Sequence, residues 1–156
     1  MDRTFLLVGA LAGVVGVALG AFGAHGLRGR LSPEMLAVFE TGVRYHMYHA
    51  LALLLVASIV GRIEGRLVVA AGWFFTAGIV LFSGSLYLLA VTGITLLGAI
   101  TPLGGVAFLI GWACLAVAAL EHRGSVLSLL RDDGRIGGHL LVGSCFRSSP
   151  ARNLKT

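Results

Sequence analysis

Eight polar side chains are the candidates for chemistry in a chain that is otherwise rich in apolar residues. They are His25, Glu40, Arg44, His46, His49, Ser83, Ser85 and Tyr87. Ionisable groups in apolar surroundings are costly, so they mark either a site or a structural lock. Imidazoles exchange protons near neutral pH, and hydroxyls can hydrogen-bond between helices. The sequence therefore indicates where polar chemistry is placed, without identifying a reaction.

The histidines of this set allow several interpretations. A zinc site needs four ligands at matched spacing, and the required Cys, Asp or further His residues are missing. Haem ligation by His25 with His46 or His49 is geometrically conceivable, but no other feature marks a haem protein. A hydrogen-bonding plug, an interface anchor and a proton-responsive group are the remaining interpretations. We therefore predict neither a metal nor a cofactor.

Glu40 and Arg44 are spaced i, i+4 with the acid first, which is the favourable order for an ion pair on a helix. The pair is either solvated, and then worth about 0.3–0.5 kcal/mol, or it pins the loop of residues 28–32 or another helix end. Ser83 and Ser85 either hydrogen-bond across helices or permit close packing. Because the chain has no nucleophile–base–acid set and no glycine-rich phosphate loop, we predict that it is not an enzyme.

Composition decides the environment in which these residues lie. Hydrophobic residues make up 57% of the 156 residues and charged residues 12%, against about 25% charged in soluble domains. The segment from Leu67 to Leu120 contains no Asp, Glu, Lys, Arg or His, and it is long enough for two membrane helices. The net charge of +5 does not indicate nucleic-acid binding, because most of the basic residues flank the apolar spans. The composition predicts an integral membrane protein that contacts the lipid bilayer.

The pattern predicts an all-α bundle of four transmembrane helices in residues 1–123. The expected spans are residues 4–24, 44–61, 67–91 and 97–120, with an amphipathic helix start at residues 33–43. Ser32, Pro33 and Glu34 form a helix start, with Ser as the N-cap, Pro in the first helical position and an acid in the first turn. Residues 124–156 are polar and basic, and we expect this tail to be poorly ordered.

The first span carries a stripe of glycines at alternating spacings of four and three residues. Its members are Gly9, Gly13, Gly16, Gly20 and Gly23. This spacing keeps them on one helical face, where small residues let another helix approach closely in lipid. The apolar stretch is also too long for the core of a signal peptide. We expect a retained helix whose glycine face packs against another helix.

The arginine distribution and the helix rise give an orientation and a depth for the polar residues. Arg3, Arg62, Arg66 and Arg123 fall on one side of the membrane, which predicts that both termini are cytoplasmic. With about 1.5 Å of rise per residue, Arg44 lies at the outer interface when Arg62 lies at the inner one. By the same count the polar residues of all four helices meet at the outer end of the bundle.

Four stretches around these residues resemble the domain of unknown function 423 family. They are Gly23–Gly26, Phe39–Ala50, Phe82–Tyr87 and Gly98–Gly105, and the Glu-Thr-Gly-Val-Arg-Tyr-His sequence that ends at His46 is the most specific. The family consists of small bacterial inner-membrane proteins similar to the eukaryotic transmembrane protein 256. The resemblance covers residues 5–120 and implies four spans, no known catalytic activity and no established function.

Two functions are compatible with these features. The first is a non-enzymatic packing, assembly or accessory protein of the bacterial inner membrane, which associates with copies of itself or with another membrane protein through its glycine stripe. The second is a small carrier or proton-linked transporter that uses the polar cluster. Redox chemistry or quinone binding is a third interpretation. Substrate, partner and oligomeric state are not encoded in a recognisable way.

Overall fold

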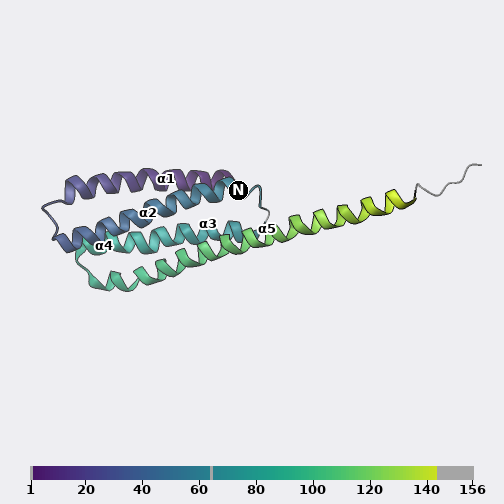
Figure 1. Cartoon of the computed structure of the whole chain (residues 1–156). Coiled ribbons are helices and arrows are strands. Elements are labelled where there is room, and N and C mark those ends of the chain that lie inside the picture. Colours follow the sequence, from purple (N-terminus) through teal and green to yellow (C-terminus); the bar gives the residue numbers. More distant parts are fainter. Residues whose placement is uncertain (1, 64, 144–156) are drawn as a thin grey trace, which may run out of the picture. The chain divides into compact units, whose positions relative to one another are not determined.

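The computed structural model describes residues 2–63 and 65–143, with side chains at residues 3–63 and 65–122. Every element in these ranges is helical, as predicted. The helices are α1 (Asp2–Ala21), η1 (Phe22–Leu27), α2 (Pro33–Ile59), α3 (Arg66–Gly78), η2 (Ile79–Ser83), α4 (Gly84–Thr92), η3 (Thr95–Ala99) and α5 (Thr101–Gly143). The π-helical turns η1 and η2 extend α1 and join α3 to α4, so the chain forms the predicted four-helix bundle (Figure 1).

The second helix begins where its capping residues predict. The Ser32 hydroxyl accepts a hydrogen bond from the backbone N–H of Met35 at 3.3 Å, and Pro33 occupies the first turn. The third span ends with α4, and Gly93, the residue after α4, has a φ of 71°. Glycine tolerates this left-handed conformation without steric cost and closes helices in this way.

Three helical segments among the described residues are long and apolar enough to cross a membrane. They are Arg3–Leu27, Arg66–Thr92 and Thr95–His122, and they contain the residues of the first, third and fourth predicted spans. Helix α2 is the fourth member of the bundle, and the part of it between residues 40 and 49 carries Glu40, Arg44, His46 and His49. These side chains lower its hydropathy, so its crossing of the membrane stays a prediction.

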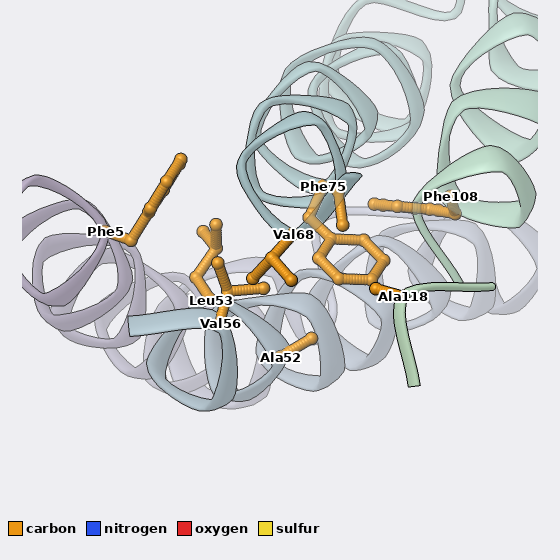
Figure 2. Packing of buried hydrophobic residues seen from close by; sticks show 9 residues of the cluster. Phe5, Ala52, Leu53, Val56, Val68, Phe75, Phe108 and Ala118 are labelled. Carbon is orange, nitrogen blue, oxygen red and sulfur yellow. The ribbon is translucent and has the colours of Figure 1, made fainter. Parts of the chain in front are cut away.

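The interior of the bundle is built from aromatic and aliphatic side chains of all four helices. Phe5 of α1, Leu53 and Val56 of α2, and Phe75 of α3 are essentially inaccessible to solvent. Figure 2 shows these residues together with Phe108 of α5, whose ring lies beside that of Phe75. The outward side chains are mostly aliphatic, as a bilayer requires.

Helix α1 packs along the length of α2 through its glycine face. A Cβ atom added to Gly9 would lie 3.1 Å from Leu53 Cβ, and one added to Gly16 would lie 2.5 Å from Met47 Sδ. Gly20 and Gly23 face Val43 and Phe39 in the same way, whereas Gly13 has no neighbour within 4 Å. The contacts run in opposite directions along the two helices, so α1 and α2 are antiparallel. Four members of the stripe therefore face a helix of the same chain.

Helix α5 approaches η2 closely at one glycine. A Cβ atom added to Gly104 would lie 2.3 Å from the backbone nitrogen of Phe82, so no larger residue fits there without movement. The helix continues to Gly143, further than the predicted end of the fourth span at residue 120. Proline, which would end a helix, is absent between Gly124 and Gly143. The rest of the expected disordered tail, residues 144–156, lies outside the described residues.

Candidate functional site: two histidine nodes and an aromatic groove

His49 is fixed in one neutral tautomer by two neighbours. Its Nδ1 lies 2.7 Å from the carbonyl oxygen of Tyr45, and a carbonyl only accepts, so Nδ1 carries the proton and donates. The indole N–H of Trp112 donates to Nε2 over 3.3 Å. The imidazole also stacks on Phe108, with ring centroids 3.4 Å apart and planes inclined by 7°. His49 therefore joins α2 to α5 with both ring nitrogens in use.

His46 lies three residues earlier and serves a different pair of helices. Its Nδ1 is 3.2 Å from the hydroxyl of Tyr87 on α4. On the α1 side, its Cδ2 lies 3.4 Å from the position of a Cβ on Gly16. The buried Nε2 makes no hydrogen bond to the described protein atoms.

Of the two serines on either side of Gly84, one is fully hydrogen-bonded and the other is not, as with the two histidines. The Ser85 hydroxyl donates to the Phe82 carbonyl at 2.9 Å and lies 2.9 Å from the Thr101 hydroxyl at the start of α5. The Ser83 hydroxyl is completely buried and has no hydrogen-bond partner among the described protein atoms. Ser85 is thus an interhelical link, and Ser83 and His46 each keep one buried polar atom unpaired.

The remaining predicted residues lie on the surface. Arg44 Nη2 and Glu40 Oε2 are 3.7 Å apart, and both side chains are more than half exposed. This geometry favours the solvated pair over a pin between helix ends, and such pairs contribute little to stability. His25 is exposed on η1, and no bond from it to the other predicted residues is described. The predicted single cluster is therefore divided into a surface group and two buried nodes.

An open groove of about 710 Å³ runs between α2 and α5, beside the His49 node. Tyr45, Tyr48, His49 and Phe82 form one side. The α5 side is formed by Pro102, Gly105, Val106, Phe108, Leu109 and Trp112. No charged side chain lines it. Its wall is held by ring contacts, including Tyr45 against Phe82 with centroids 4.7 Å apart.

Sequence reasoning did not assign Trp112, Thr101 and Phe108 to the site. Trp112 donates to His49 from 63 positions along the chain. The available signal was a hydrogen-bond donor in an apolar span, since a buried indole N–H seeks an acceptor. Among the described residues, no group of three His, Cys, Asp or Glu side chains is placed to hold a metal ion.

The bundle and its buried histidine nodes define the class of protein. It is a helical membrane protein whose helices are joined by hydrogen bonds between polar side chains. The comparison with protein families gives the assignment, because residues 19–105 match the family described as "Protein of unknown function (DUF423)". The chain belongs to this family, as the resemblance implied.

Named relatives support the assignment. The chain is 54% identical over 121 residues to the UPF0382 membrane protein YwdK of Bacillus subtilis, covering 77% of this chain and 98% of that protein. It is 48% identical over 122 residues to the UPF0382 membrane protein SERP0230 of Staphylococcus epidermidis, covering 78% and 99%. No solved structure matches the chain significantly. The relatives are membrane proteins, and their names state no activity.

Proposed function

We propose that this protein is a non-enzymatic accessory protein of the bacterial inner membrane that holds another membrane component beside its helices. The observation that supports this proposal is the use of the polar side chains. His49, Tyr87 and Ser85 all bond to other helices of the same chain. Groups engaged in this way stabilise a fixed arrangement of helices, and such an arrangement is suited to presenting a surface.

The exposed surface of the bundle is consistent with binding in the plane of the membrane. The groove between α2 and α5 is lined mainly by apolar and aromatic side chains. The glycine stripe contributes less to association than the sequence suggests, because Gly9, Gly16, Gly20 and Gly23 face α2. Gly13 alone of the five has open space in front of it.

Purification in a mild detergent from native membranes, followed by mass spectrometry of co-eluting proteins, tests this proposal. We expect a stoichiometric membrane partner that co-elutes with the wild-type chain. Recovery of the chain without any co-eluting protein at native expression would contradict an accessory role.

A proton-linked carrier is the second candidate, and the two unpaired polar atoms favour it. His46 Nε2 and Ser83 Oγ are buried without protein partners, and such atoms call for water, a proton or a ligand. Proteoliposomes with an imposed pH gradient and an internal pH dye test this function. Proton flux that is lost in His46→Gln but kept in His25→Gln would support it, and flux equal to empty liposomes would exclude it.

A further inference from the structure

We propose that the groove between α2 and α5 is a binding site for one acyl chain of a bilayer phospholipid. One wall of the groove belongs to the segment Thr95–His122, which is long and apolar enough to span a membrane. A hollow at this depth meets hydrocarbon in the absence of a protein partner. This inference does not depend on the accessory role, because it concerns a lipid and not a protein.

The shape of the groove favours a chain over a compact ring. Its α5 wall is a single strip of residues from Pro102 to Trp112. At a rise of about 1.5 Å per residue, this strip is about 15 Å long and runs parallel to the helix axis. An extended acyl chain in a bilayer has the same direction. A flat head group would need a short, deep pocket instead.

The chemistry of the lining also fits an uncharged chain with an ester at one end. No charged side chain faces the groove, and its surface is mainly aromatic and aliphatic. The Tyr45 and Tyr48 side chains are 42% and 59% exposed at its rim. Tyrosine places a hydrogen-bond donor at the membrane interface, where ester carbonyls lie.

Hydrogen bonds and ring contacts brace the wall, which separates this groove from the ordinary lipid contact of any helix. His49 is held by the Tyr45 carbonyl and the Trp112 indole and stacks on Phe108. The side chains of the wall are therefore held by one another and not by a ligand, and a preformed site loses less conformational entropy on binding.

Glycine positions supply a matched pair of variants. A Cβ on Gly105 would lie 3.8 Å from the Phe82 ring, so a side chain there fits the backbone while a leucine fills the groove. A Cβ on Gly13 has no neighbour within 4 Å and lies outside the groove. Gly105→Leu is the test and Gly13→Leu the control, since both add the same side chain to a helix.

The experiment uses the full chain in vesicles of phosphatidylethanolamine and phosphatidylglycerol that contain a phosphatidylcholine with a photoreactive diazirine acyl chain. After irradiation, mass spectrometry maps the labelled residues. We expect labelling concentrated at Tyr48, Val106 and Leu109, lost in Gly105→Leu and retained in Gly13→Leu. Leu109→Trp narrows the groove from an already exposed position and gives the same loss if Gly105→Leu fails to fold.

Two results would overturn the proposal. One is labelling distributed evenly over all outward side chains and unchanged in Gly105→Leu and Leu109→Trp, which is ordinary lipid contact. The other is native mass spectrometry of the wild-type chain that shows an isoprenoid quinone or a protein segment retained in place of a phospholipid and lost in the same variants.

Discussion

The bond between Trp112 and His49 ties α5 to α2 by a single donor and a single acceptor. Trp112→Phe removes the donor and leaves His49 Nε2 without its described partner. Interhelical hydrogen bonds in membrane proteins contribute about 0.6 kcal/mol on average and at most about 1.7 kcal/mol. We expect a coupling in this range between Trp112→Phe and His49→Phe, measured as a double-mutant cycle of unfolding free energy in mixed micelles.

The control for this cycle is a tryptophan outside the node. Trp73 on α3 contacts Phe5 by an edge-on ring interaction with centroids 5.7 Å apart. Trp73→Phe is expected to show no coupling to His49→Phe, because sites without shared contacts are additive. A Trp112–His49 coupling indistinguishable from zero would mean that the bond does not stabilise the bundle.

The sequence identified the polar side chains of the candidate site. It did not show that they separate into a surface group and two buried nodes. His46 and His49 are three positions apart on one helix, and this spacing turns one toward Tyr87 and the other toward Trp112. Their partners are 41 and 63 positions away along the chain. Such long-range pairs depend on which helices are neighbours, and the sequence pattern of a single helix does not contain that information.

Helix boundaries were more predictable than the site, because capping is local. Ser32 caps α2 through the Met35 N–H. Ser32→Ala is therefore expected to destabilise the protein by about 1 kcal/mol, measured by thermal unfolding in detergent. Ser32→Asp, which restores an acceptor, is the control and should retain the stability. Equal unfolding of wild type and Ser32→Ala would show that the cap is not used in the membrane-bound protein.

The same helix start gives a pH dependence. Hydrogen bonds from the backbone and from Ser32 hold the pKa of Glu34 below its ordinary value of 4.5. A carboxyl whose pKa is lowered by folding stabilises the fold above its ordinary pKa, and this contribution is lost as the pH falls through the lowered value. Carboxyl NMR titration should show a lowered Glu34 pKa that rises toward the ordinary value in Ser32→Ala. A Glu34 pKa that is the same in the wild type and in Ser32→Ala would exclude a hydrogen bond between Ser32 and Glu34.

The junction of α5 with η2 gives the sharpest contrast between neighbouring residues. Gly104→Ala forces a Cβ to within 2.3 Å of the Phe82 backbone nitrogen, whereas Gly105→Ala meets only ordinary contacts at 3.8 Å. Overpacking of this kind costs about 1–3 kcal/mol. We expect a lower unfolding temperature for Gly104→Ala and a change close to zero for Gly105→Ala. Equal effects of both variants would contradict the described approach of α5 to η2.

Across the whole molecule, the hydropathy pattern and the glycines between the apolar spans predicted the helical class and the four-helix bundle. They did not predict the partner of the α1 glycine face, because a small-residue stripe is the same whether its partner is in the same chain or in another. Hydropathy placed the end of the fourth membrane span at residue 120, and the helix that contains this span, α5, continues to Gly143. Loss of hydropathy marks the end of a membrane span and not the end of a helix.

The number of membrane crossings is the remaining question at this scale, and α2 decides it. Its hydropathy is reduced by polar residues, but it packs against α1 from Phe39 opposite Gly23 to Leu53 opposite Gly9. Since Arg3–Leu27 is apolar and long enough to cross, we expect that a helix that accompanies it over this length crosses as well. Four crossings place both termini on one side, and the arginine distribution predicts that this side is the cytoplasm.

Reporter fusions test this topology. We expect a fluorescent protein to be active, and alkaline phosphatase inactive, when fused either at the N-terminus or after Arg123. A phosphatase fused after Gly29, in the connection between α1 and α2, is expected to be active because this connection would lie outside the membrane. Termini on opposite sides would mean three crossings and would place α2 at the membrane surface. That outcome is difficult to reconcile with His46 and His49 buried at 5% exposure, since a surface helix would present polar residues to water.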